Sequence, residues 1–240
     1  SAFESNLADP INAAILNEGA IRTIGAFAID ARGATSMHLV NTGTIIGDIL
    51  LGDLGNTVDT RNGKISGTIT GGDGTDTYKI SSSDVDIQDW GSAFGDTVIS
   101  TASYTLVGGL DDLILKGKVD ADGVGNIGNN ELLGNAGKNR LSGLEGADRI
   151  KGGLGNDVLV GGGGIDEFVF RRGHGSDRIE DLELTDSLVS AYVQSPRDFK
   201  LLDIRQAGDD VIIDFGHGDR LRLVEFDRAD LDFDLFNRPT

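Results

Sequence analysis

Apolar residues recur along this chain in short runs of two to four, and the runs are bounded by Gly, Asn, Asp or Thr. The spacing of three and four residues that marks one face of a helix is scarce. Short apolar runs between turn-forming residues are typical of brief β-strands joined by tight turns. The pattern therefore predicts an all-β protein.

A strict period of nine residues runs from Gly125 to Val169. The stretch divides into five blocks, GNIGNNELL, GNAGKNRLS, GLEGADRIK, GGLGNDVLV and GGGGIDEFV, with Gly at the first and fourth positions and a large apolar residue at the eighth. Neighbouring side chains of a strand point to opposite faces, so the eighth residue is the expected core position, and glycine permits the turns between strands. The sixth positions hold Asn130, Asn139, Asp148, Asp157 and Asp166.

Two such blocks make one coil of a parallel β-solenoid, in which equivalent turns lie one strand spacing, about 4.8 Å, apart. The sixth-position carboxylates would then stack into columns of like charge that oppose folding. A hard divalent cation between stacked turns removes the repulsion, and calcium suits it because calcium accepts six to eight oxygen ligands in flexible geometry. No His or Cys stands in the five blocks, which excludes zinc or copper as the intended metal.

Residues 152–160 and 161–169 match every fixed position of the pattern G-G-x-G-x-D-x-U-x, where U is a large apolar residue. Residues 71–79, GGDGTDTYK, match it with Tyr as the apolar member. On these motifs the chain resembles the RTX, or hemolysin-type, calcium-binding proteins. The resemblance implies a calcium-binding RTX β-roll that holds several Ca²⁺ ions, export by type I secretion machinery, and an extracellular or cell-surface location.

The resemblance also implies which residues hold calcium, through paired sixth-position carboxylates one coil apart and backbone carbonyls of the same turns. The first site pairs Asp148 with Asp166 and adds the carbonyls of Leu144, Gly146, Gly161 and Gly163. The second pairs Asp157 with Asp177, beyond a two-residue insertion, and adds the carbonyls of Gly153, Gly155, Arg172 and His174. A third joins Asp166 to Asp181 and Asp186. Sites that include Asn130 or Asn139 carry one negative charge fewer and should be weaker or empty. Asp76 finds its nearest partner in Asp96.

Outside the array the repeat is looser. The stretches NEGAI, NTGTI and RNGKI place glycines at 19, 43 and 63, which predicts further solenoid coils, although three unrelated hairpin turns would give the same dipeptides. We therefore expect solenoid coils over 1–80 that end in one RTX block, irregular bridging coils over 81–124, the RTX β-roll over 125–186, and a β capping segment over 187–240. Trp90 is expected in the core at a coil edge, and His38, His174 and His217 are expected at surface turns.

The composition of the chain excludes several classes of binding partner and of metal site. The 240 residues carry a formal net charge of −18, so nucleic acid and anionic membranes are excluded as partners and cations are favoured. The absence of cysteine excludes disulfides and thiolate metal sites. No apolar run approaches the roughly 20 residues of a transmembrane helix. With no export signal at Ser1, the acidic and aromatic stretch 229–236, ADLDFDLF, becomes the candidate secretion signal, because it resembles RTX export tails.

The function expected from these features is a non-catalytic calcium-binding module, structural or adhesive, that folds on calcium binding after secretion. The motifs HExxH and GxSxG, which would indicate an appended protease or lipase, are absent from the sequence. An accessory or catalytic solenoid of a polysaccharide-acting enzyme, such as an alginate epimerase, is the alternative. Binding of an extracellular polysaccharide or cell surface without catalysis is a third possibility.

Overall fold

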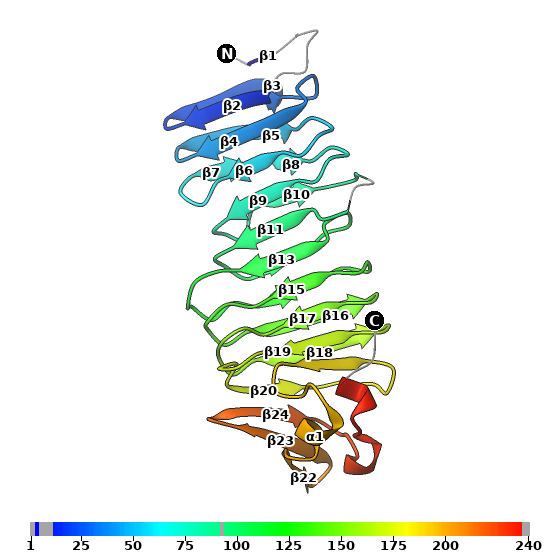
Figure 1. Ribbon diagram of the computed structural model, residues 1–240. Coiled ribbons are helices and arrows are strands. Elements are labelled where there is room, and N and C mark those ends of the chain that lie inside the picture. The colour runs from blue at the N-terminus through cyan, green and yellow to red at the C-terminus, as the bar shows by residue number, and fades with distance from the viewer. Residues whose placement is uncertain (1–2, 5–11, 92–93, 237–240) are drawn as a thin grey trace. The chain divides into compact units, whose positions relative to one another are not determined.

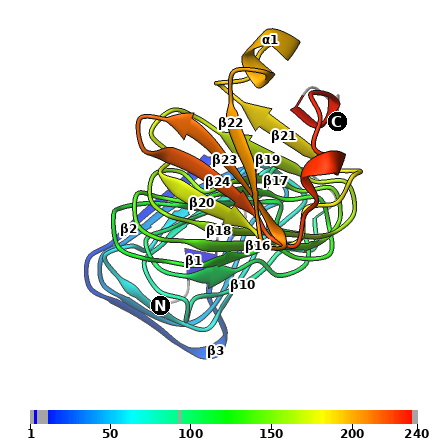
Figure 2. The ribbon, with the colours of Figure 1, turned by 90° about the horizontal axis from the view of Figure 1, so that it is seen from below.

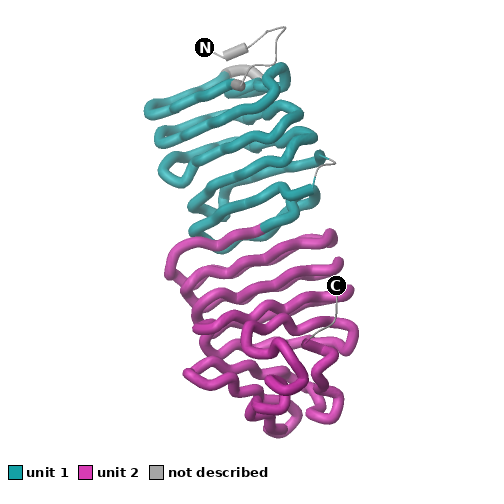
Figure 3. Tube along the Cα trace, viewed as in Figure 1, with its two compact units in different colours: residues 1–112 teal, residues 113–240 magenta. Residues whose placement is uncertain are grey.

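The computed structural model describes residues 3–4, 12–91 and 94–236, and in these ranges the protein is almost entirely β (Figure 1). The chain divides into two compact units, residues 1–112 and 113–240 (Figure 3). Each unit is a β-solenoid built from parallel strands, which confirms the predicted fold class. None of the helices in the described ranges is long and apolar enough to cross a membrane.

The N-terminal unit has two parallel sheets. One has the order β1 (Phe3–Glu4), β3 (Ala20–Asp30), β5 (Thr44–Leu50), β8 (Thr68–Thr70) and β10 (Asp86–Gln88), with β7 (Lys64–Ser66) also paired to β5. The other has the order β2 (Asn12–Asn17), β4 (Ser36–Asn41), β6 (Thr57–Asp59), β9 (Thr77–Ile80) and β11 (Thr97–Ser100). The short strand β12 (Tyr104–Thr105) follows them.

The loose glycine repeat of this unit is a true structural repeat. Ile21, Ile45 and Ile65 lie in register on successive parallel strands, so the turns at these glycines join the two sheets within successive solenoid coils and the hairpin alternative is wrong. On the facing sheet Val58, Tyr78 and Val98 are aligned in the same way, and all three are fully buried. Aligned apolar residues of successive coils therefore make the core of this unit. Ile11, which opens the predicted repeat, lies outside the described residues.

The C-terminal unit repeats this plan with the nine-residue blocks. One sheet has the order β13 (Asp112–Leu115), β15 (Glu131–Leu133), β17 (Arg149–Lys151), β19 (Glu167–Phe170) and β21 (Ser187–Ser190). The other contains β14 (Gly123–Val124), β16 (Arg140–Glu145), β18 (Val158–Gly163) and β20 (Ser176–Ile179). The eighth-position residues are fully buried, as expected: Leu132, Leu141, Ile150, Leu159 and Phe168.

A C-terminal segment closes the second sheet of this unit. Strand β24 (Asp219–Leu223) pairs with β20 in parallel, and β23 (Asp210–Gly216) and β22 (Asp203–Ala207) then add antiparallel strands. Seen from below in Figure 2, β23 and β24 lie over β20. The helix α1 (Pro196–Phe199) and the 3₁₀ turns η1 (Arg228–Asp230) and η2 (Asp234–Phe236) complete the segment. These elements cover the strand edge that an open solenoid would expose.

Candidate metal centre

The sixth-position side chains of the C-terminal unit form two columns, one at each edge of the coils. In the first, the backbone N–H of Asn130 donates to Asp148 Oδ1 (2.8 Å), that of Asp148 to Asp166 Oδ1 (2.9 Å), and that of Asp166 to Asp186 Oδ1 (3.0 Å). Each carboxylate thus bonds to the turn one coil earlier. The structure brings together the predicted pairs Asp148 with Asp166 and Asp166 with Asp186.

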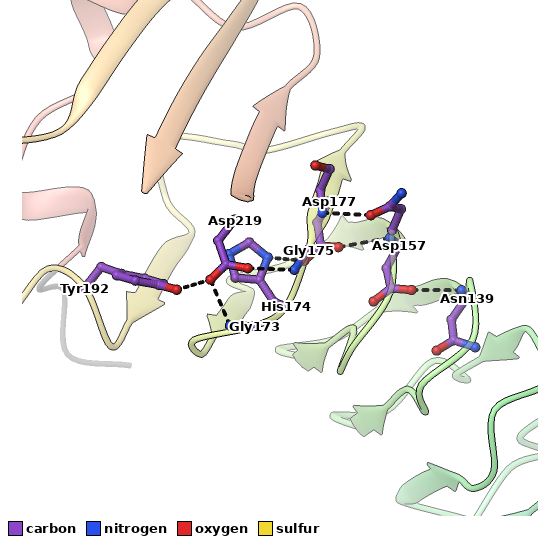
Figure 4. A network of polar contacts seen from close by, with 10 residues as sticks. Asn139, Asp157, Gly173, His174, Gly175, Asp177, Tyr192 and Asp219 are labelled. Carbon is purple, nitrogen blue, oxygen red and sulfur yellow. Dashed lines mark hydrogen bonds and ion pairs between the residues drawn. The ribbon is translucent and has the colours of Figure 1, made fainter. Parts of the chain in front are cut away.

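The second column has the same construction. The N–H of Asn139 donates to Asp157 Oδ1 and that of Asp157 donates to Asp177 Oδ1, both at 2.9 Å (Figure 4). The exposed fractions of Asp148, Asp157, Asp166 and Asp177 are 2, 1, 1 and 3 %. Four buried carboxylates therefore stand one strand spacing from a neighbouring carboxylate, as the repeat pattern predicts.

One aspartate in each column has a side-chain oxygen that no hydrogen-bond donor of the described residues reaches. Asp148 Oδ2 and Asp157 Oδ2 are buried, and no hydrogen-bond donor among the described residues reaches either atom. Burial, together with a smaller contribution from the carboxylate one coil later, raises the pKa of Asp148 and of Asp157 to about 7. Burial likewise raises the pKa of Asp166 to about 6. A cation at the free oxygens would remove the cost of burying these charges, so the carboxylates fit a metal ion.

The first-position glycines make room for these carboxylates. A Cβ atom on Gly143, Gly152 or Gly161 would lie 2.0, 2.3 and 2.2 Å from Oδ2 of the aspartate in its own turn. The second position has positive φ in the last three of the five blocks, where Gly153 adopts 102° and Gly162 adopts 100°. Leu144 adopts the same conformation at φ 85° without the freedom of glycine, so it is the strained member of the array. Together the glycines shape a cradle that another side chain would fill.

Backbone carbonyls must supply most of any metal shell here. Among the described residues, no three His, Asp or Glu side chains converge as a metal-binding group. Of the predicted carbonyl ligands, that of Gly163 accepts the N–H of Gly146 (2.9 Å) and keeps a second lone pair. Stacked turns of carbonyls with two carboxylates are a donor set of hard oxygens, which suits calcium.

In the turns that carry asparagine at the sixth position, hydrogen bonds within the protein occupy the side-chain oxygen, so no metal is needed there. Asn130 Oδ1 accepts the N–H of Asn126 (2.7 Å), and Asn139 Oδ1 accepts that of Asn135 (2.8 Å). Asn139 Nδ2 also donates to the carbonyl oxygen of Ala121 at 2.6 Å, the kind of oxygen that would otherwise coordinate a cation. An amide can donate where a carboxylate cannot. These contacts give a physical reason for the expected weakness of sites that include an asparagine.

In the last aspartate of each column, the second carboxylate oxygen also has a hydrogen-bond partner in the protein. Asp186 Oδ2 accepts the N–H of Glu183 (2.8 Å), and Asp177 Oδ2 lies 2.8 Å from Nδ1 of His174. Asp181, predicted to share the third site, directs its two oxygens to the N–H groups of Gly161 and Gly162. His217 lies at an exposed turn as expected, whereas His38 is exposed but lies in strand β4. The prediction for His174 is wrong, since it is only 2 % exposed.

The N-terminal unit contains a shorter column of the same kind. The N–H of Asn56 donates to Asp76 Oδ1 and that of Asp76 donates to Asp96 Oδ1, both at 2.7 Å. Asp96 Oδ2 is buried without a donor among the described residues, and burial raises the pKa of Asp96 to about 7. The hydroxyl of Tyr78 lies within hydrogen-bond distance of Asp76 Oδ2 (3.1 Å) and of Asp89 Oδ2 (2.8 Å).

Two of these residues were not predicted from the sequence. Asn56 stands in a turn with only one of the pattern's glycines, and Asp89 directly follows β10, at the position one coil beyond Gly71. Trp90, expected in the core beside Asp89, is 74 % exposed, so that prediction is wrong. The alternation of the strand could have indicated it, because Ile87 and Asp89 point inward and Trp90 outward.

Comparison with known proteins agrees with this geometry. Residues 124–159 and 133–168 match the family model of the RTX calcium-binding nonapeptide repeat, which spans four copies. This segment is therefore an array of RTX calcium-binding repeats, as the sequence resemblance indicated. A search of curated proteins gave no match.

Among solved structures, the extracellular lipase LipA from Serratia marcescens aligns with a TM-score of 0.39 and 16 % sequence identity. The alignment covers 90 % of this chain and 42 % of the lipase, so the chain spans less than half of that protein's length.

Proposed function

We propose that this chain is a non-catalytic, calcium-dependent folding module of a secreted or cell-surface protein. The observation that carries the proposal is the pair of buried, unpartnered oxygens on Asp148 and Asp157 in stacked RTX turns. A ligand that binds only the folded chain stabilises it by its binding free energy. The module would stay unfolded where calcium is scarce and fold where calcium is abundant.

The strongest proposed site lies between the turns of Asp148 and Asp166, where both partners are carboxylates and one has a free buried oxygen. Its further ligands would be the carbonyls of Leu144, Gly146, Gly161 and Gly163. The site between Asp157 and Asp177 would add those of Gly153, Gly155, Arg172 and His174. Calcium supplies positive charge between the stacked turns of a column when it is bound. The chain's own contribution is to hold the carboxylates in register through the N–H bonds described above.

Export through type I machinery is the second part of the proposal, with the stretch 229–236 as its recognition element. In the folded unit three of its apolar residues are buried, with Leu231, Leu235 and Phe236 at 4, 1 and 6 % exposure, and Phe199 packs against Phe236. A transporter could therefore bind this stretch only before the chain folds. The stretch forms 3₁₀ turns and no strand of the predicted β capping segment, and residues 237–240 lie outside the described part.

Deletion of residues 229–240 should abolish export from cells that carry the cognate type I transporter. The measurement is the fraction of the chain in the medium, with total expression as the reference. Replacing Leu235 by Ala removes cap packing while leaving the acidic tail, so it should be exported normally although it is less stable outside. Undiminished export of the deletion variant would contradict the proposed role of the stretch 229–236.

A specific observation favours binding of an acidic polysaccharide as a second function. A groove of about 410 Å³ in the C-terminal unit is lined by Lys116, Lys151, Arg171 and Arg172, in a chain whose net charge is −18. None of the ion pairs found among the described residues involves these four side chains. Burial, followed by the charge of Arg171, lowers the pKa of Lys151. An anion in the groove would relieve this repulsion.

The groove predicts that the double variant Lys151→Ala and Arg171→Ala binds a uronate polymer on the order of tenfold more weakly than the native chain, because two close cation contacts are lost. Polygalacturonate and neutral dextran, compared at constant free calcium, provide the binding assay. Arg197→Ala with Lys200→Ala removes the same charge from α1 in the same unit and should leave affinity unchanged. Equal losses in the two double variants would show that net charge, not the groove, governs binding.

A further inference from the structure

The second column ends in an arrangement that its other members lack. Asp219, at the start of β24, accepts the N–H groups of Gly173 (2.8 Å) and Gly175 (3.0 Å), and the N–H of Arg220 donates to the carbonyl of Gly175 (2.7 Å). The cap thus places a carboxylate one strand beyond the turn of Asp177. In the proposed sites, carboxylates that lie one strand apart share a cation. Asp177 and Asp219 would therefore be the next such pair.

The ring of His174 occupies this position. Figure 4 shows it between Asp177 and Asp219, on the side of Asp177 that faces away from Asp157. Its Nδ1 lies 2.8 Å from Asp177 Oδ2, while Nε2 has no hydrogen-bond partner among the described residues. The equivalent oxygens of Asp148 and Asp157 have no hydrogen-bond partner in the part of the chain that the structure describes.

Other residues at the third position of a block point outward. Leu154 and Ile127 are 53 and 82 % exposed, whereas His174 is 2 % exposed. Its ring is held inside by the rings of Phe170, Phe215 and Tyr192, at centroid distances of 5.3, 5.7 and 6.4 Å. The hydroxyl of Tyr192 in turn donates to Asp219 Oδ2. The inward position of His174 is therefore stabilised by Phe170 of the array together with Tyr192 and Phe215 of the capping segment.

We propose that His174 takes the place of a calcium ion at the end of this column. Its ring N–H donates to the Asp177 oxygen that a metal would otherwise bind, so the last metal site of the column is the one between Asp157 and Asp177. The capping segment then packs on a turn that needs no cation. The inference rests on the proposed calcium sites of the array. It implies that removal of the imidazole creates a divalent-cation site between Asp177 and Asp219, within reach of the Tyr192 ring.

The test compares the native chain with His174→Ala at saturating calcium. Equilibrium dialysis should find one more bound ion per chain in the variant. Terbium, which occupies calcium sites and is excited through nearby tyrosine, should show extra emission in the variant, and adding Tyr192→Phe should remove that increment. Tyr192→Phe alone should leave the emission of the native chain unchanged. His217→Ala, which alters an exposed histidine, should bind the native number of ions.

An equal ion count in His174→Ala and the native chain would overturn the inference, and so would Tyr192-dependent terbium emission in the native chain. Failure of His174→Ala to fold at saturating calcium would also contradict it, because calcium should replace the ring. His174→Gln, which retains a side-chain N–H donor for Asp177, should fold with the native ion count. A native chain that binds no calcium would instead refute the proposed function of the array.

Discussion

Replacing Asp166 or Asp148 by Ala should lower calcium affinity on the order of tenfold or more, while Asn139→Ala should change it little, because carboxylate charge sets the affinity of calcium sites. Asp166 should show the larger loss, since it is paired with Asp148 on one side and Asp186 on the other. Asn139 already donates to Ala121 and accepts from Asn135, so its loss should reduce stability without removing a metal ligand. Calcium titration against a competing chromophoric chelator provides the affinities.

Asp148→Asn is the matched control for this series. It keeps the size of the side chain and converts the turn to the kind seen at Asn130, whose amide is satisfied by its own turn. We expect this variant to bind calcium as weakly as Asp148→Ala, yet to be more stable than the native chain in chelator, because the unpartnered buried oxygen is gone. Equal calcium affinities for the Asp148, Asp166 and Asn139 variants would contradict the pairing of sites.

Removal of calcium should unfold residues 125–186 at neutral pH and should invert the pH dependence of their stability. Burial raises the pKa of Asp148 and Asp157 to about 7 in the metal-free fold, from a usual value of 3.8. Between these values the folded chain binds more protons than the unfolded chain, so metal-free stability falls as pH rises from about 4 to about 7. In calcium the direction reverses, because the ion binds only the deprotonated carboxylates. Circular dichroism in chelator should therefore show more structure at pH 5 than at pH 7.5.

Much of the array could be predicted from the sequence because the repeat is strictly local. A period of nine fixes which residue of each block is buried, and two blocks per coil fix which carboxylates stack. Leu132, Ile150 and Phe168 are aligned for this reason. The pairing of Asp157 with Asp177 was also predictable, since the two-residue insertion only lengthens one turn.

The hydrogen bonds that link His174, Asp177, Tyr192 and Asp219 at the end of the second column could not be predicted. They depend on contacts between residues far apart in the sequence, which the repeat does not determine. Asp219 bonds to Gly175 from 44 residues further along the chain, and Tyr192 reaches Asp219 across 27 residues. Nothing near His174 in the sequence shows that aromatic rings of the cap will hold it inside. Trp90 was misplaced for a different reason, since apolar character was given more weight than strand alternation.

The difference between the ends and the middle of each column suggests how the array is bounded. Asparagines begin both columns and use their amides, whereas Asp177 and Asp186 end them and use His174 and the N–H of Glu183. Within these two columns, Asp148 and Asp157 keep a buried oxygen without a donor among the described residues. Dependence on calcium should therefore be concentrated in the middle coils, and the first and last turns should tolerate its removal better.

Hydrogen exchange of the whole chain at pH 7.5, with calcium and with excess chelator, tests the central claim most directly. The account predicts that protection of residues 125–186 appears only with calcium, and that the turns around Asp148, Asp157 and Asp166 change most. The strands β2 to β9 of the N-terminal unit, which bury large apolar residues such as Leu39, Ile45 and Ile69, should retain part of their protection in chelator. Full protection of residues 125–186 in excess chelator would contradict the account.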